Sequence, residues 1–407
     1  MNKFPSINEQ MDIIKRGVQE IIPEKELEEK IVRSIKSNKP LQVKLGCDPS
    51  RPDLHLGHSV VLIKLRHFQD LGHQAILIIG DFTGIIGDPT GKNKTRPSLT
   101  LEETKINGKT YFDQASKILS SKNVTIKYNS EWLANKTFAD IIHISSKYTI
   151  ARMLERDDFT QRYKSGEPIA MHEFLYPLAQ AYDSVAIKAD VELGGTDQKF
   201  NLLVGRDLQK EFGQMPQVII TLPLLVGTDG VDKMSKSLDN YIGISESPKD
   251  IYGKTLSIPD NLIIDYFTLA TDVSTKSITN SKKLLDSGEI NPRDVKRELA
   301  RELVALYYSK EIAENAEKEF DEIFVKKNNP MNIEEFILNS KSISLLQLLV
   351  DTKLCESKSQ AKRVIEQGGV SIENKKITDP MSNITISESV VLKVGKRNFI
   401  KLIPFHK

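Results

Sequence analysis

The stretch from residue 41 to 79 constrains the fold most, because it carries a strand, a helix and a second strand in direct succession. Residues 42–45 alternate polar and apolar side chains, Pro49 interrupts the pattern, and apolar positions at helical spacing follow over about 58–71. The continuous apolar run 75–79 is typical of a parallel strand buried on both faces. The pattern predicts a right-handed βαβ unit in an α/β domain, where ligands bind beyond the carboxyl ends of the strands.

Two histidines, His55 and His58, stand at the start of the predicted helix, where free backbone N–H groups and the positive end of the helix dipole suit a phosphate. Taken alone, they could equally be a surface cap or half of a metal site that lacks its other ligands. A second stretch, DKMSKSLDN at 232–240, favours the phosphate, because Lys233 and Lys236 lie three residues apart in a segment too polar for a core. Together the two stretches predict a triphosphate ligand and a mobile loop that closes over it.

Composition separates a basic tail from a slightly acidic body. Residues 341–407 hold 12 Lys and Arg against 6 Asp and Glu, a net charge of +6, whereas residues 1–340 hold 45 against 49, a net charge of −4. A small basic terminal domain favours a polyanion such as nucleic acid, although a solvated lysine surface would give a similar count.

Length and residue usage narrow the class of protein. A chain of 407 residues predicts two or three domains, and no apolar run approaches the roughly 18 residues of a membrane span. The N-terminus lacks the apolar block of a signal peptide, so we expect a cytoplasmic protein without a membrane partner. Cys47 and Cys355 fall in different predicted domains, which leaves neither a disulfide framework nor a four-thiolate metal site.

A polar stripe marks the predicted helix around residues 173–184. Tyr176, Gln180 and Asp183 fall at positions i, i+4 and i+7, so a phenol, an amide and a carboxylate share one helical face. The stripe could face solvent, but its apolar neighbours leave little exposed surface elsewhere. We therefore expect it to line a pocket.

The motifs HLGH at 55–58 and KMSKS at 233–237, in this order on one chain, resemble the two signatures of the class I aminoacyl-tRNA synthetases. With TGIIGDPTGK at 83–92 and GGTDQ at 194–198, the resemblance to the bacterial tyrosyl-tRNA synthetases extends across essentially the whole chain. It implies that tyrosine is activated with Mg-ATP to tyrosyl-adenylate and pyrophosphate. The tyrosyl group is then transferred to the 3′-terminal adenosine of tRNA(Tyr). Mg²⁺ enters with ATP as substrate, and no protein-bound metal site is expected.

The resemblance also implies roles for individual residues at matching positions. The catalytic residues are His55, His58, Lys233 and Lys236; the ATP-binding residues are Asp48, Gly57, Gly195, Asp197, Lys233, Ser235, Lys236 and Ser237; the tyrosine-binding residues are Asp88, Tyr176, Gln180, Asp183 and Gln198. Within the last group Asp88, Tyr176 and Gln180 meet the amino end of tyrosine, and Asp183 accepts its phenol proton. A pocket that hydrogen-bonds a hydroxyl rejects the analogue lacking it by roughly 10⁵, a figure measured on this same family.

The same resemblance implies the division of the chain. A Rossmann-like catalytic domain covers 1–247, with a dimer-forming helical insertion near 131–184; an all-helical domain at 248–327 meets the anticodon arm. A small α+β module of the ribosomal-protein type covers 341–407, and its helix carries Lys358, Lys362 and Arg363 as candidate tRNA contacts. A homodimer is expected.

Two alternatives and one departure stay open. A tryptophanyl-tRNA synthetase shares the fold and both signatures, but Asp183 and the basic module argue against it. A non-catalytic RNA-binding relative is the other alternative, and the intact histidines and lysines argue against that. The departure is Lys44, which stands where many family members carry a tyrosine whose hydroxyl meets the substrate phenol. Either another group supplies that contact or Asp183 discriminates alone.

Overall fold

A computed structural model describes residues 4–49, 53–89, 100–325, 333–373, 375–395 and 398–405. The chain divides into two compact units, residues 1–314 and 315–407, and each is described by itself.

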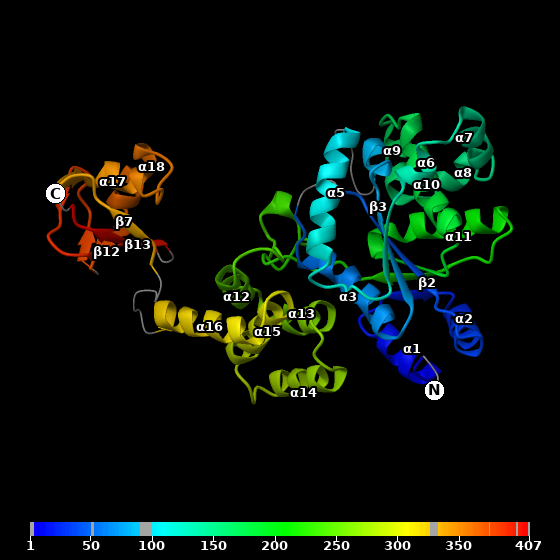
Figure 1. The fold of residues 1–407 in the computed structure, drawn as a ribbon, viewed down its shortest axis with the longest axis horizontal. Helices are drawn as coiled ribbons and strands as arrows, with labels where there is room; N and C mark the ends of the chain where they lie inside the picture. The colour runs from blue at the N-terminus through cyan, green and yellow to red at the C-terminus, as the bar shows by residue number, and fades with distance from the viewer. Residues whose placement is uncertain are drawn as a thin grey trace. The chain divides into compact units, whose positions relative to one another are not determined.

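A six-stranded sheet forms the centre of the first unit (Figure 1). Its strands are β1 (Glu20–Ile22), β2 (Gln42–Cys47), β3 (Gln74–Ile79), β4 (Val124–Tyr128), β5 (Val191–Gly195) and β6 (Val218–Leu222), in the order β1-β6-β5-β2-β3-β4. All neighbours pair in parallel except β1, which is antiparallel to β6. The side chains of β3 and β6 are almost entirely buried, as the apolar runs predict for strands covered on both faces. The predicted βαβ unit is confirmed as β2-α3-β3.

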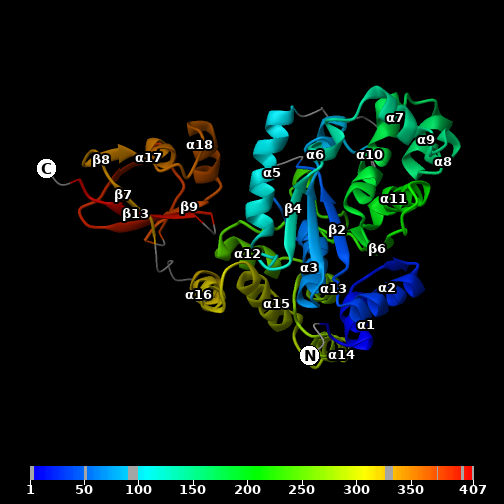
Figure 2. The same cartoon turned by 45° about the vertical axis from the view of Figure 1, so that its right-hand side comes forward.

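Helices cover both faces of this sheet. Helix α3 (Leu56–Asp70) packs on β2, β3 and β5, whereas α11 (Lys199–Glu211) packs on β5 and β6. Helix α5 (Leu101–Ala115) and the pair α10 (Met171–Ile187) and α11 lie on opposite sides of the sheet (Figure 2). The remaining helical segments between β3 and β6 are α4 (Thr83–Ile86), α6 (Ser130–Leu133), α7 (Phe138–Ser145), α8 (Ile150–Met153), α9 (Asp157–Ser165) and the short η1 (Thr196–Gln198).

The N-terminal segment of the first unit folds as two helices with a short strand between them. Helices α1 (Ile7–Lys15) and α2 (Glu24–Ser37) are present, but β1 lies between them and pairs with the edge of β6. A three-residue strand is too short for its alternation to be read from sequence, and it is stabilised only by the partner that it finds in the folded chain.

After β6 comes the loop that carries residues 233–237, with its short helix η2 (Lys236–Leu238), and residues 248–325 are then mainly helical. The helices are α12 (Pro248–Leu256), η3 (Asp260–Leu262), α13 (Ile263–Ala270), α14 (Thr275–Asp286), α15 (Pro292–Tyr307) and α16 (Lys310–Phe320), followed by the π-helical turn η4 (Asp321–Val325). Helix α13 packs on α3, so this helical part shares contacts with the helix that follows the two histidines.

The second unit has its own apolar core, built by residues such as Leu348, Ile365 and Leu392. Its helices are α17 (Leu345–Asp351) and α18 (Lys358–Glu366). Its five-stranded sheet has the order β10-β9-β12-β13-β7, and β8 pairs with β11. The strands are β7 (Glu335–Ile337), β8 (Ser342–Ser344), β9 (Val370–Ile372), β10 (Lys375–Ile377), β11 (Asn383–Thr385), β12 (Val390–Val394) and β13 (Asn398–Ile403). Helix α18 carries Lys358, Lys362 and Arg363, as the sequence predicts.

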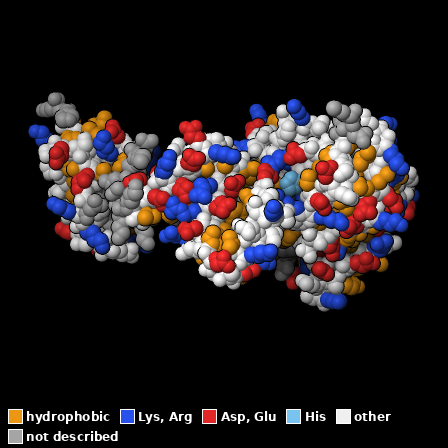
Figure 3. Space-filling view, turned by 90° about the horizontal axis from the view of Figure 1, so that it is seen from below, with side chains coloured by type: hydrophobic (Ala, Val, Ile, Leu, Met, Phe, Trp, Pro, Cys, Tyr) orange, Lys and Arg blue, Asp and Glu red, His pale blue; other side chains and the backbone are white. Residues whose placement is uncertain are grey.

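No helix among the described residues is both long enough and apolar enough to cross a membrane. On the face drawn in Figure 3, basic and acidic side chains are interspersed, with apolar side chains between them.

Candidate active site

A pocket of about 360 Å³ opens at the carboxyl ends of the central strands. It is lined by residues from the ends of β2 and β5, the start of α3, one face of α10 and the loop after β6. It brings together most of the residues predicted to bind tyrosine and ATP: Asp48, His55, Gly57, His58, Asp88, Tyr176, Gln180, Asp183, Gly195, Asp197, Gln198, Lys233 and Ser235. Lys236 and Ser237 are not part of its lining. This volume lies within the usual range for a small-molecule site.

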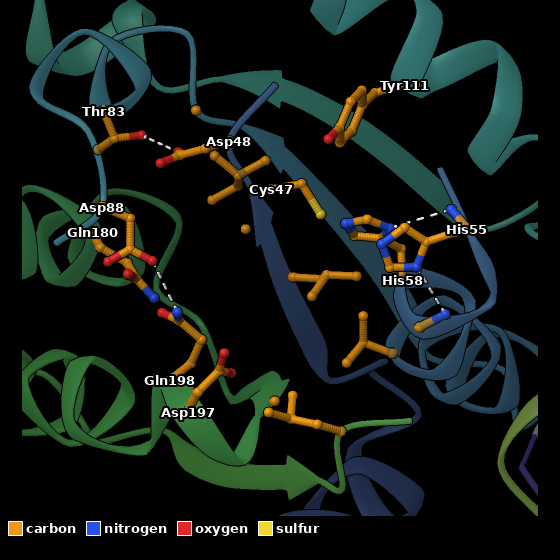
Figure 4. Close-up of a pocket in the computed structure, with 18 of the residues that line it drawn as sticks. Cys47, Asp48, His55, His58, Thr83, Asp88, Tyr111, Gln180, Asp197 and Gln198 are labelled. Atoms are coloured by element: carbon orange, nitrogen blue, oxygen red, sulfur yellow. Dashed lines mark hydrogen bonds between the residues drawn. The ribbon is translucent and has the colours of Figure 1, made fainter. Parts of the chain in front are cut away.

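The histidines cap the start of α3 with their ring nitrogens (Figure 4). His55 Nδ1 accepts a hydrogen bond from the Gly57 N–H at 3.2 Å, and His58 Nδ1 accepts one from the His55 N–H at 3.3 Å. A neutral imidazole that accepts at Nδ1 carries its proton at Nε2. Each ring is therefore left with an Nε2–H donor that its cap does not use.

Both rings are neutral at physiological pH. Burial lowers the pKa of His55 to about 3, with His58 and Lys236 adding to the effect, and burial with Lys236 lowers the pKa of His58 to about 4. The ring centroids lie only 3.9 Å apart, where two positive charges would repel each other. The pair therefore offers neutral hydrogen-bond donors rather than cations.

Asp183 is 3% exposed, and two neutral donors hold it. The Trp132 Nε1–H donates to Oδ1 at 2.8 Å, and the Asn129 side-chain amide donates to Oδ2 at 3.3 Å. Burial nevertheless raises the pKa of Asp183 to about 7, because desolvation outweighs these hydrogen bonds and the nearby charge of Lys44. The carboxylate is thus a fixed acceptor that titrates near neutral pH.

Asp48 joins the loop after β2 to two other elements. The Tyr176 hydroxyl donates to its Oδ2 at 2.7 Å, and the Thr83 hydroxyl donates to its Oδ1 at 2.7 Å. Burial and the Asp48 charge raise the pKa of Tyr176 well above its ordinary value, so its phenol stays protonated. The Asp48 side chain therefore orients Tyr176 and Thr83, and its contact with ATP stays a prediction.

The amide side chains of Gln180 and Gln198 approach Asp88 (Figure 4). Gln198 Nε2 donates to Asp88 Oδ2 at 3.0 Å, and the Gln198 carbonyl accepts from Asn201 at 3.0 Å. Among the described side chains, none donates to Gln180 Oε1, although that atom is buried. A buried acceptor without a donor costs free energy unless a ligand supplies one, so this corner of the pocket suits a cationic amine.

The two loop lysines are paired with carboxylates. Lys233 Nζ donates to Asp197 Oδ2 at 3.3 Å, and Lys236 Nζ donates to Asp53 Oδ2 at 2.6 Å. Backbone bridges fasten the loop and the segment after it to the pocket, with Met234 N bonded to Leu225 O and Leu56 N bonded to Ile242 O. The lysines therefore already lie over the mouth of the pocket and the start of α3.

The candidate tRNA contacts Lys358, Lys362 and Arg363 lie on α18 in the second unit, and all three are exposed. Lys362 Nζ lies 3.9 Å from Glu366 Oε1, an i,i+4 pair on the same helix. They form a basic face of this helix.

Several site residues were missed from the sequence. The sequence assigns no role in the site to Asn129, Thr83, Trp132 or Asp53. Asn129 immediately follows the carboxyl end of β4, so the rule that ligands bind beyond the carboxyl ends of parallel strands could have found it. No local pattern distinguishes the other three, because their partners lie far away in sequence.

Two family models match the chain. One, described as tRNA synthetases class I (W and Y), matches residues 36–325, and the other, described as the tyrosine–tRNA ligase SYY-like C-terminal domain, matches residues 324–402. The chain is 56% identical over 400 residues to a tyrosine–tRNA ligase of Chlorobaculum tepidum, covering 98% of each chain. It is 53% identical over 396 residues to the tyrosine–tRNA ligase of Thermotoga maritima, covering 97% of each.

Solved structures resemble it in fold. The tyrosyl-tRNA synthetase of Archaeoglobus fulgidus, complexed with L-tyrosine, has a TM-score of 0.63 at 23% identity and covers 76% of this chain and 99% of its own. A truncated mitochondrial tyrosyl-tRNA synthetase of Coccidioides posadasii has a TM-score of 0.61 at 24% identity and covers 77% and 91%.

Proposed function

The chain belongs to the tyrosine–tRNA ligases, within the class I tRNA synthetases for tryptophan and tyrosine, and joins tyrosine to tRNA with ATP; we propose that the pocket described above performs both steps of this reaction. The observation that carries the proposal is the buried, doubly held carboxylate of Asp183, which shares one pocket with the two Nε2–H donors of His55 and His58. Tyrosine needs a hydrogen-bond acceptor for its phenol, and ATP needs hydrogen-bond donors for its phosphate oxygens.

In the proposed pose, the tyrosine phenol donates to Asp183 and its ammonium group lies against Asp88, Tyr176 and Gln180. The unpartnered Gln180 oxygen supports this end of the pose, since an ammonium group supplies the missing donor. Gln198 holds Asp88 in place from the other side.

The first step requires no enzyme nucleophile. The tyrosine carboxylate attacks the α-phosphorus of Mg-ATP in line, a P–O bond forms, and pyrophosphate leaves with the electrons of the broken P–O bond. The enzyme contributes position and donors aimed at the phosphate oxygens. His55, His58 and the backbone at the start of α3 face one side, and Gly195 and Asp197 lie where the ribose would bind.

The loop lysines act on the leaving group. Lys233 and Lys236 exchange Asp197 and Asp53 for pyrophosphate oxygens as the triphosphate binds, with Ser235 and Ser237 in the same loop. The ammonium charges then stabilise the charge that develops on pyrophosphate.

In the second step, a hydroxyl of the terminal ribose of tRNA attacks the tyrosyl carbonyl and AMP leaves. We propose that the helical part, 248–327, meets the anticodon arm and that the module at 341–407 adds phosphate contacts through Lys358, Lys362 and Arg363. Their exposure on α18 supports this role.

We also propose a homodimer formed by the insertion near 131–184. Five large apolar side chains are exposed on α7 to α10, a region that Figures 1 and 2 show as one group of helices: Phe138, Ile142, Ile150, Tyr163 and Met171. Such a concentration of exposed apolar groups marks an interface. Light scattering on the purified protein should give twice the mass of 45.9 kDa, and Phe138→Glu should give a monomer.

The test of the proposed function is ATP–pyrophosphate exchange with each of the twenty amino acids in the absence of tRNA. We expect exchange with tyrosine alone. Exchange with tryptophan would overturn the assignment of Asp183, and exchange with tyrosine that survives Asp183→Ala unchanged would do the same.

A further inference from the structure

Lys44 is a fully buried cation in the middle of β2. Its Nζ makes three contacts: it donates to the Gln180 carbonyl oxygen at 2.9 Å and to the Ser184 hydroxyl at 2.8 Å, and it forms an ion pair with Glu192 Oε1 at 2.8 Å. Three acceptors use all three N–H bonds of the ammonium group. This satisfied geometry is what a charge needs to remain buried.

The partners of Lys44 are themselves held. Glu192 Oε2 accepts from the Ser184 hydroxyl at 3.1 Å and from the Gln217 side-chain amide. The network thus ties β2 to α10 and β5, with Gln217 just before β6. Lys44 itself does not line the pocket, although its neighbours Leu45 and Gly46 do.

Two of the contacts of Lys44 lie on either side of Asp183. Gln180 precedes Asp183 by three residues and Ser184 follows it directly. The Lys44 ammonium group therefore bonds both ends of the helical turn that contains Asp183. The same turn presents Gln180 and Asp183 to the pocket. A shift of this turn would move both predicted tyrosine contacts together.

We propose that Lys44 is a positioning residue for tyrosine selection, which fixes the 180–184 turn of α10 and with it the Asp183 side chain that accepts the substrate phenol. In this proposal Lys44 acts on the tyrosine pocket without touching the substrate. The proposal rests on the proposed role of Asp183.

The charges around Asp183 predict in which direction its pKa changes when a neighbouring charge is removed. Lys44 on β2 lowers the pKa of Asp183, Glu192 on β5 raises it, and Trp132 and Asn129 are neutral donors that lower it. Tyr176 lies on the same helix and stays protonated, with Asp48 and Asp88 facing it. Removing Lys44 therefore raises the pKa of Asp183, whereas removing the charge of Glu192 lowers it.

The experiment measures kcat/KM for tyrosine and for phenylalanine in ATP–pyrophosphate exchange between pH 5.5 and 9. The variants are Lys44→Met, Glu192→Gln and the double variant, which leaves no unpaired buried charge. Lys64→Met is the matched control, because Lys64 is a second buried lysine that bonds three backbone carbonyls, of Ile13, Ile14 and Arg16, outside the pocket. Thermal unfolding identifies the pH range in which each variant is folded.

We expect Lys44→Met and the double variant to lose at least about tenfold in the preference for tyrosine over phenylalanine at pH 7. The acidic side of the pH profile of kcat/KM for tyrosine should move to higher pH in Lys44→Met and to lower pH in Glu192→Gln. In the double variant the two effects oppose each other, so the profile should move less than in Lys44→Met. Lys64→Met should change the unfolding temperature. It should change neither the preference for tyrosine over phenylalanine nor the acidic side of the pH profile.

If the double variant keeps the preference of the unmodified protein for tyrosine over phenylalanine, Lys44 is only structural and the proposal is wrong. Should Lys44→Met fail to fold, Glu192→Gln still decides, since an acidic side of the pH profile that is unmoved or moved upward contradicts the proposal. Failure of the proposed function is a separate outcome, because the unmodified protein would then show no tyrosine-dependent exchange at any pH.

Discussion

The Trp132 indole N–H donates a 2.8 Å hydrogen bond to Oδ1 of Asp183. It connects α6 to α10 at the buried end of the pocket. Trp132 is the single tryptophan of the chain. It does not line the pocket itself, but this bond places it behind the carboxylate that we propose accepts the tyrosine phenol.

Trp132→Phe should therefore weaken tyrosine activation while keeping an aromatic ring in place. A hydrogen bond to a charged group contributes about 1.5–3 kcal/mol, which corresponds to a loss of roughly 10- to 100-fold in kcat/KM for tyrosine. Exchange with phenylalanine, which has no phenol hydroxyl, serves as the internal control and should change far less. An equal loss for both amino acids would contradict the assignment.

The raised pKa of Asp183 also makes a stability prediction. Its native pKa of about 7 lies above the ordinary 3.8, so the native state binds a proton that the unfolded state releases, and stability falls as pH rises from about 4 to 7. Asp183→Asn removes this cost, which is at most about 4 kcal/mol at pH 8 for a shift of about three pH units. Its free energy of unfolding, relative to the unmodified protein, should be greatest at pH 8 and least at pH 5, as denaturant titrations can measure. A constant difference across this range would show that the carboxylate does not titrate there.

Asp53→Asn should release Lys236. The pair is partly solvated, with Asp53 60% exposed, so its contribution is about 0.2–1 kcal/mol, and the KM for ATP should fall by about two- to fivefold. Glu26→Gln is the matched control, because Glu26 pairs with Arg206 at the same 2.6 Å, between α2 and α11 and outside the pocket lining. A lower kcat with an unchanged KM would mean that Asp53 orients Lys236 instead of competing for it.

A chain that ends at residue 325 should retain tyrosine-dependent exchange and lose tRNA charging. The cut removes β7 together with all the later strands and helices of the second unit, because β7 pairs with β13 and a cut at residue 341 would leave it unpaired. Replacing Lys358, Lys362 and Arg363 by alanine in the full chain should weaken charging and reduce its salt dependence. Equal loss of exchange and charging would contradict the separation of roles.

The site was predictable from the sequence where chemistry follows local order. Alternating and apolar runs located β2, α3 and β3, and the rule that ligands bind beyond the carboxyl ends of parallel strands then placed Asp88 and the histidines at one edge of the sheet. Family resemblance added the roles of Tyr176, Gln180 and Asp183.

The rest depends on contacts between distant segments. Lys44 lies in a run with the polar-apolar alternation of an ordinary strand, and no residue near it in sequence indicates that Glu192 is its partner. Similarly, Glu20–Ile22 is a strand only because β6 offers it an edge. Such pairings are products of the folded chain, and a single sequence does not contain them as patterns.

That short strand has a consequence for handling the protein. Without β1, the outer edge of β6 would present unpaired backbone groups beside Val218–Leu222, a segment buried throughout. An exposed apolar strand edge recruits strands from other molecules and promotes aggregation. The first 22 residues therefore protect solubility. A shortened expression product that lacks them should precipitate although it still contains all the proposed catalytic residues.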